Sequence, residues 1–82
     1  MHVRLFAGLR DRLPDAPRGR GEVELGAGAS LLDLLDHLAI PPKLAQMVLV
    51  DGQQAPRKPG ERAAMILGEG QTVAVFPPLA GG

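Results

Sequence analysis

The chain of 82 residues contains no cysteine, tryptophan or tyrosine, and only two phenylalanines. The lack of cysteine excludes disulfides, thiolate-bound metals, iron–sulfur clusters and a catalytic thiol within the chain. With so few aromatic residues, the sequence has no platform on which nucleic-acid bases stack. It also lacks an apolar run as long as a signal-peptide core or a membrane span. We therefore expect a soluble, cytoplasmic protein with no membrane partner.

The chain also has no excess of positive or negative charge, because nine Lys and Arg balance nine Asp and Glu and the formal net charge is zero. The arginines are spread along the chain and form no basic run, so we expect no nucleic-acid partner. A chain of this length forms one small domain, with no second core and no room for an elaborate active site.

The N-terminal residues alternate polar and apolar side chains in the manner of a half-buried strand. In residues 2–7 the odd-numbered side chains are predicted to face the core, and Phe6 is predicted to face outward. Residues 10–21 contain two prolines and two glycines, which predicts a loop. Residues 22–25 then predict a short second strand that pairs back on the first.

A helix is predicted to begin at Leu31. Ser30 and Asp33 form an S-x-x-D capping signal in front of an apolar run. Asp36 is read as part of the solvated face, and Pro41-Pro42 is expected to end the helix. The residues that recur at helical spacing, and so predict a buried face, are Leu31, Leu34, Leu35 and Leu38.

The second half of the chain predicts further strands. Residues 47–50 read as a strand that runs into an Asp-Gly hairpin turn at residues 51–52. Residues 53–56 predict a weak return strand, and the Pro-Gly pair at residues 59–60 predicts another turn. The apolar segment 63–67 fits more than one type of element.

The last predicted strand covers residues 72–76 and again alternates. The complete order is strand, strand, helix, strand, weak strand, strand. The economical arrangement is α+β, with one main helix packed on one face of a mixed sheet of four to five strands. We expect a domain over residues 1–76 and a flexible, extended C-terminal tail over residues 77–82.

The tail is the most informative segment for function. Pro77 and Pro78 hold the backbone extended, so the tail is predicted to project as an arm of roughly 20 Å, at about 3.3–3.6 Å per residue. Gly81 and Gly82 carry no side chain that would block entry into a partner's channel. The expected reactive group is the C-terminal carboxylate of Gly82. The intervening arm residues are Leu79 and Ala80.

Several segments of the chain, in order, resemble one protein family. Residues 3–10 (VRLFAGLR), the turn at 51–52, residues 70–73 and above all residues 76–82 (FPPLAGG) are similar to the β-grasp, ubiquitin-like sulfur carriers. The resemblance is closest to the small subunit of molybdopterin synthase (MoaD-like), with the thiamin-pathway carrier (ThiS-like) more distant. One departure is Gln71, where many relatives carry Asp.

The resemblance implies a chemistry for the arm. An E1-like enzyme (MoeB- or ThiF-like) would use ATP and Mg to adenylate the Gly82 carboxylate. A donor such as a cysteine desulfurase or a rhodanese would then supply sulfur, giving a thiocarboxylate. In the MoaD-like case the sulfur passes to a pterin precursor in the large synthase subunit (MoaE-like). The chain itself would be a non-catalytic subunit that binds no cofactor.

The resemblance also implies a docking surface, because the first and last strands are neighbours in this fold. Phe6 and Phe76 would then form one exposed apolar patch beside the tail, suited to partner docking. His2 and His37 lack spaced ligands and read as surface residues, so we expect no metal site.

Three other functions remain open on the sequence. The first is sulfur delivery to thiamin, to tRNA thiolation or to cysteine synthesis. The second is a protein modifier that is conjugated to lysines through Gly82. The third is a plain β-grasp interaction module with an inert tail.

Overall fold

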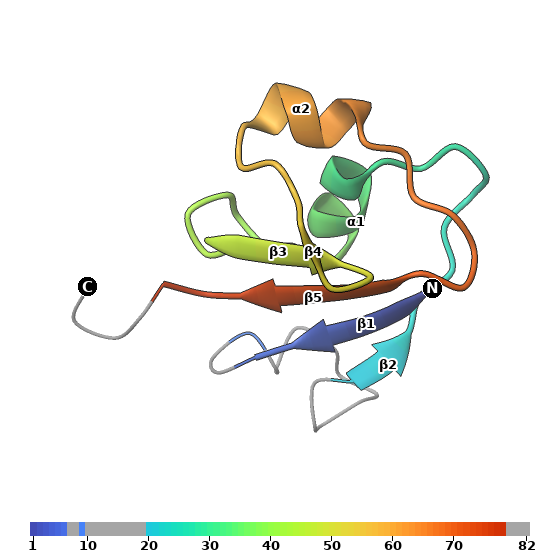
Figure 1. The fold of residues 1–82 in the computed structure, drawn as a ribbon, viewed down its shortest axis with the longest axis horizontal. Helices are drawn as coiled ribbons and strands as arrows, with labels where there is room; N and C mark the ends of the chain where they lie inside the picture. Colours follow the sequence, from blue (N-terminus) through green and yellow to red (C-terminus); the bar gives the residue numbers. More distant parts are fainter. Residues whose placement is uncertain (7–8, 10–19, 79–82) are drawn as a thin grey trace.

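The computed structural model describes residues 1–6, 9 and 20–78, which form one mixed sheet and two short helices (Figure 1). The elements are β1 (His2–Leu5), β2 (Arg20–Glu22), α1 (Leu31–His37), β3 (Met47–Val50), β4 (Gln53–Gln54), α2 (Pro59–Ala64) and β5 (Thr72–Phe76). No helix in this described part of the chain is long and apolar enough to cross a membrane.

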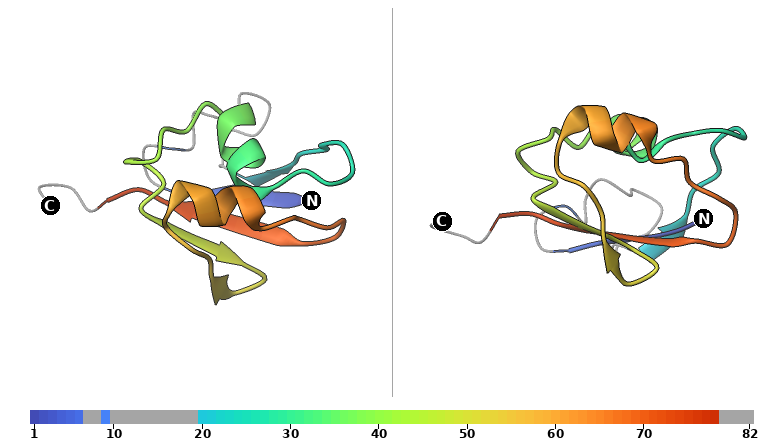
Figure 2. Two further views of the ribbon diagram at one scale, coloured as in Figure 1. Left: turned by 90° about the horizontal axis from the view of Figure 1, so that it is seen from above. Right: turned by 45° about the horizontal axis from the view of Figure 1, so that its top comes forward.

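The first and last strands of the chain, β1 and β5, lie side by side in the middle of the sheet. The strand order is β2-β1-β5-β3-β4. β1 and β5 are parallel, whereas β1–β2, β3–β5 and β3–β4 are antiparallel. Both helices cover the same face of the sheet (Figures 1 and 2). The fold is therefore α+β, with a mixed sheet that helices cover on one face, as the sequence predicts.

The core fills the space between the sheet and the helices. Alternate residues of β1, β3 and β5 are buried, as strand periodicity requires. The leucines of α1 meet them from above, and each side chain removed from water in this way contributes about 1.5–3 kcal/mol. The large apolar side chains with the least exposure are Val3, Leu31, Leu34, Leu35, Val48, Val73 and Val75.

The N-terminus of α1 confirms the predicted cap. The Asp33 N–H donates to Ser30 Oγ at 3.1 Å, and the Ser30 N–H donates to Asp33 Oδ2 at 2.9 Å. This reciprocal pair is a capping box, which satisfies two backbone donors that have no partner inside the helix.

The C-terminus of α1 differs from the prediction, because the helix ends at His37 before the proline pair at 41–42. Ala39 adopts φ 56°, a left-handed conformation. Its N–H donates to the Asp36 carbonyl at 3.0 Å, while the Ile40 N–H donates to the Leu35 carbonyl at 2.9 Å. These two bonds form a Schellman-type cap that closes the helix one turn earlier.

The second strand lies earlier than predicted, at Arg20–Glu22 instead of 22–25. The register pairs His2 with Glu22. The next pair is Met1 with Val23, whose backbones exchange two hydrogen bonds of 3.0 and 3.1 Å. Pairing with β1 therefore sets the position of β2.

The prediction of a turn at residues 59–60 is wrong, because these residues begin α2. Proline has a φ suited to the first helical turn, where its missing N–H costs nothing. The unassigned segment 63–67 supplies the end of α2 and then an isolated antiparallel bridge between Ile66 and Ser30. That bridge ties the connection before β5 to the start of α1.

Candidate functional site

The arm leaves the domain at the end of β5. Beyond Phe76, Pro77 is half-buried and Pro78 is exposed. β1 and β5 are parallel, so both strands begin at one end of the sheet and finish at the other. The end where they finish, next to the arm, is called the arm end. The end where they begin is called the far end. Leu79, Ala80, Gly81 and Gly82 lie outside the described residues, so the proposed carboxylate site stays a prediction.

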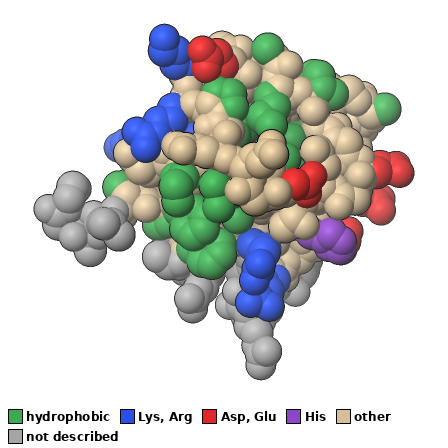
Figure 3. Space-filling model, in the orientation of Figure 1, with side chains coloured by type: hydrophobic (Ala, Val, Ile, Leu, Met, Phe, Trp, Pro, Cys, Tyr) green, Lys and Arg blue, Asp and Glu red, His purple; other side chains and the backbone are tan. Residues whose placement is uncertain are grey.

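The two phenylalanines meet on the sheet face that the helices leave uncovered. Phe6 and Phe76 are stacked, with ring centroids 4.2 Å apart and planes 9° from parallel. Both are half-buried, and Met47 lies opposite Phe76 in the neighbouring strand. Phe6, Phe76 and Met47 form an apolar row across the sheet next to the arm. In Figure 3 hydrophobic side chains gather there.

A second row crosses the same face one step further from the arm. The strand registers place Ala74 between Arg4 and Leu49, and place Arg20 opposite Arg4. Cross-strand partners point to the same side of a sheet, so this row is apolar over β3 and β5 and cationic over β1 and β2. The uncovered face therefore combines an apolar surface with two neighbouring guanidinium groups.

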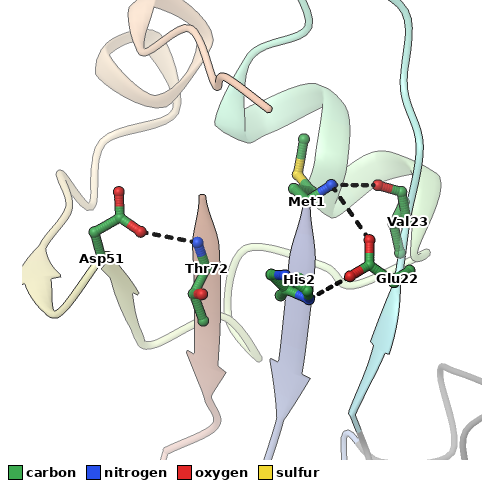
Figure 4. A network of polar contacts seen from close by, with 6 residues as sticks. All are labelled: Met1, His2, Glu22, Val23, Asp51 and Thr72. Atoms are coloured by element: carbon green, nitrogen blue, oxygen red, sulfur yellow. Dashed lines mark hydrogen bonds and ion pairs between the residues drawn. The ribbon is translucent and has the colours of Figure 1, made fainter. Parts of the chain in front are cut away.

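Polar contacts close the far end of the sheet (Figure 4). The Glu22 carboxylate contacts His2 Nδ1 and also lies 3.9 Å from the Met1 ammonium. The Asp51 carboxylate accepts from the Thr72 N–H at 2.9 Å, and the Asp51 N–H donates to the Thr72 carbonyl at 2.8 Å. These contacts hold strand ends together and involve exposed side chains, as expected of a structural role.

The hairpin between β3 and β4 confirms the predicted Asp-Gly turn. Asp51 has φ 51° and Gly52 has φ 82°. Positive φ at both central residues is the type I′ pattern, whose twist matches that of the two strands. Gln71, the departure noted in the sequence, accepts a hydrogen bond from the Gly68 N–H at 2.7 Å, so glutamine keeps a turn-closing role there.

The acidic and histidine side chains that the sequence singled out lie at separate places in the fold. Within residues 1–6, 9 and 20–78 no group of three or more His, Cys, Asp and Glu is arranged to hold a metal ion. Asp33 caps α1, and Asp36 is exposed on its surface. His2 pairs with Glu22, and His37 occupies the last turn of α1.

Arg62 is the residue that sequence reasoning missed. Its side chain is only 2% exposed. Nε donates to the Pro56 carbonyl at 2.7 Å, and Nη2 donates to the Ala45 carbonyl at 2.9 Å. Burial, and then repulsion from Arg57, lowers the pKa of Arg62. One guanidinium thus joins α2 to the segment before β3 and the segment after β4, and no local pattern signals this.

Comparisons with known proteins agree with this architecture. The family model described as "ThiS family" matches residues 3–82. The crystal structure of SAMP1 from Haloferax volcanii superposes with a TM-score of 0.67 at 25% identity, covering 100% of this chain and 98% of that chain. A second structure, of H. volcanii small archaeal modifier protein 1, gives 0.67 at 24% identity, covering 96% and 97%. No curated protein matches. The predicted β-grasp, ubiquitin-like fold is confirmed.

Proposed function

The chain belongs to the ThiS family, and on that basis we propose that it is a sulfur carrier whose reactive group is the Gly82 carboxylate. The observation that supports this most directly is the family match itself, which includes the Gly-Gly segment. The geometry is consistent with it, because β5 runs straight into the Pro-Pro arm beside an uncovered apolar row.

The proposed reaction has three steps. The Gly82 carboxylate attacks the α-phosphate of ATP on an E1-like enzyme, which releases pyrophosphate and forms an acyl-adenylate. A persulfide on the sulfur donor then attacks the acyl carbon and AMP leaves, which gives an acyl disulfide between carrier and donor. A thiol of the partner enzyme then attacks the donor's own sulfur, so that the S–S bond to the carrier breaks, a disulfide forms between the partner proteins, and the carrier is released as a thiocarboxylate. In this scheme the chain contributes the acyl group and the arm, and the partner supplies ATP, magnesium and the acid–base groups. The carrier is therefore a non-catalytic component.

Incubation of the carrier with its adenylating enzyme, ATP, magnesium and a sulfur donor is expected to replace one C-terminal oxygen by sulfur. Intact-mass analysis of the carrier measures this exchange directly. A reaction without ATP is the control, since the carboxylate is not electrophilic until it is adenylated. An unchanged mass in the complete reaction, with pyrophosphate release also absent, would rule out the carrier proposal.

Within the family we propose the molybdopterin synthase pathway, with this chain as the small subunit. The support is the sequence resemblance, strongest in FPPLAGG at residues 76–82. Reconstitution with a molybdopterin synthase large subunit (MoaE-like) tests it, because the thiocarboxylated carrier should then convert the pterin precursor. Conversion of a thiazole precursor, a tRNA or a cysteine precursor instead would assign one of the other sulfur pathways.

Protein modification is the second candidate function. It is favoured by the similarity to a small archaeal modifier protein over 100% of this chain. A modifier would form an isopeptide bond between Gly82 and a lysine amine of a target. Mass spectrometry of digested cell lysate for lysines that carry the C-terminal remnant tests this, and remnants that disappear when the gene is deleted would establish it.

We propose that the apolar row of Phe6, Phe76 and Met47 docks the adenylating enzyme. Truncation of an interface aromatic typically costs 2 kcal/mol or more, so Phe6→Ala is expected to weaken binding by roughly thirtyfold or more. The loss of free-protein stability is expected to be nearer 1 kcal/mol, because Phe6 is half-buried and loses mainly its stacking on Phe76. Calorimetric titration with the enzyme and a denaturant melt measure the two quantities.

Ile66→Ala is the matched control for this experiment, because Ile66 is 58% exposed and lies in the connection before β5, at the far end. It is expected to leave affinity unchanged. If Phe6→Ala binds as tightly as Ile66→Ala, the phenylalanine pair only covers the sheet and the docking proposal is wrong.

A further inference from the structure

The facing arginines of β1 and β2 are an unfavourable feature of the free protein. Arg4 and Arg20 are direct cross-strand partners. Like charges in this position repel, and strands normally avoid them. Among the described residues neither guanidinium has a carboxylate partner, since Glu22, the acidic residue on β2, contacts His2 and the Met1 ammonium. Proteins tolerate such destabilising contacts mainly at functional sites, so the arginine pair is a candidate for a functional role.

The arginine pair adjoins the surface proposed above for docking. Arg4 lies next to Ala74, one row from the stacked phenylalanines. A hollow beside the pair is lined by His2, Val3, Arg4, Arg20, Gly21, Glu22 and Thr72. Glu22, its one carboxylate, is paired with His2 and faces the Met1 ammonium. In Figure 3 Lys and Arg side chains lie directly beside the hydrophobic cluster. A partner that covers the apolar row therefore also covers the guanidinium groups.

Charge is separated along the strand direction in the described part of the chain. The described carboxylates outside the helices are all at the far end, close to the starts of β1 and β5. The described Lys and Arg side chains lie toward the middle of the sheet and the arm end, where the exposed Glu61 in the first turn of α2 accompanies Lys58. The carboxylates are Glu22, Glu24, Asp51 and Glu69, and the exposed or half-buried cations are Arg4, Arg20, Lys43, Arg57 and Lys58. Figure 3 shows most acidic side chains on the right and most basic ones on the left and below.

This separation indicates the charge of the partner. A field that is positive around the arm attracts an acidic surface and orients the carrier with its arm forward. At short range two adjacent guanidinium groups are suited to one carboxylate, which accepts hydrogen bonds from both. The neighbouring row of Phe6, Phe76 and Met47 is apolar, which suits a protein surface better than a phosphate backbone.

We propose that the Arg4–Arg20 pair binds a carboxylate side chain on an acidic surface of the adenylating enzyme that receives the arm. This inference rests on the proposed function and adds the chemistry of the partner's surface to it. The carboxylate neutralises the repulsion between the two arginines, so part of the stability lost in the free carrier is recovered in the complex.

Arg20→Glu tests the pair, because stability and affinity are expected to change in opposite directions. The substitution places opposite charges across the strands, which is expected to raise the melting temperature by about 1–5 °C. Affinity for the enzyme is expected to fall at least tenfold, because the new carboxylate repels the partner's. A merely structural arginine would not separate the two readouts in this way.

Lys58→Glu is the matched control. It changes the net charge equally and is exposed at the N-cap of α2, on the helix side of the molecule. It is expected to slow association at low salt only, since exposed charges are screened at high ionic strength. The loss of enzyme affinity in Arg20→Glu is expected to persist at high salt, where it appears as faster dissociation. Calorimetry and surface plasmon resonance at two salt concentrations compare the variants.

Four results would overturn the inference. One is equal behaviour of Arg20→Glu and Lys58→Glu, and another is a lower melting temperature for Arg20→Glu. The third is unchanged enzyme affinity together with lost binding to single-stranded DNA, which would assign the pair to nucleic acid. The fourth is a wild-type carrier that neither binds the enzyme nor gains sulfur, which removes the proposed function as well. If the wild-type carrier binds the enzyme and gains sulfur, the proposed function stands and the variants test the arginine pair alone.

Discussion

Removal of Gly82 is expected to abolish thiocarboxylate formation while leaving the fold intact. The deletion moves the terminal carboxylate back by about 3.5 Å, one extended residue. An in-line attack tolerates a displacement of that size poorly, because reacting atoms must approach to about 3–3.5 Å. The buried core lies between Val3 and Val75, so the melting temperature is expected to stay the same. Intact-mass analysis and a thermal melt measure the two effects.

Extension by one alanine beyond Gly82 complements the deletion, since it keeps both glycines and still displaces the carboxylate. Gly26→Ala is the matched control for a changed glycine. No atom lies within 4 Å of a Cβ built at Gly26. It is expected to gain sulfur as the wild type does. A domain that unfolds when Gly82 is lost would contradict the proposed division into a folded body, residues 1–76, and an arm, residues 77–82.

Arg62→Ala is expected to destabilise the domain by about 3 kcal/mol. The substitution removes both donors from the Pro56 and Ala45 carbonyls, and an unsatisfied buried polar group costs about 1–3 kcal/mol. It also leaves a cavity where the buried side chain lies, beside Ala45 and Pro56. For a domain of this size the melting temperature is expected to fall by more than about 10 °C. Calorimetric or circular-dichroism melts measure it.

Arg57→Ala is the control, since it removes the same charge from a neighbouring exposed side chain. Its effect is expected to stay within about 0.5 kcal/mol, as for most surface substitutions. Arg62→Lys separates charge from geometry, because one ammonium group does not reproduce the two fork-like donors. Equal melting of the Arg62→Ala and Arg57→Ala proteins would show that the buried contacts contribute nothing.

The location of Arg62 bears on function as well as stability. The segment that ends at Ala45 leads into Met47, and Met47 lies opposite Phe76 at the arm end. Through its bond to Ala45, the buried guanidinium holds this segment in place. Stability of α2 and the shape of the uncovered face near the arm are therefore linked through one side chain.

Local sequence signals predicted most of the elements correctly. The Ser30–Asp33 cap, the leucine face of α1 and the turn at 51–52 each depend on residues within a few positions of one another. The same holds for strand alternation in β1, β3 and β5. The errors have two kinds of cause. The Pro-Gly pair at 59–60 suits both a turn and a helix start, which is a local ambiguity. The position of β2 depends on its pairing with β1, which is distant in sequence.

The sequence by itself determined the alternating strands and the amphipathic helix, and it predicts the Pro-Pro arm with its Gly-Gly end. These features follow from backbone preferences and from spacing along the chain. Only the tertiary structure decided which side chains meet. The stacking of Phe6 on Phe76, the facing of Arg4 and Arg20, and the burial of Arg62 join residues that are distant in sequence. A net charge of zero likewise concealed the separation of acidic and basic side chains, because composition counts charges and only strand pairing and chain path place them in space.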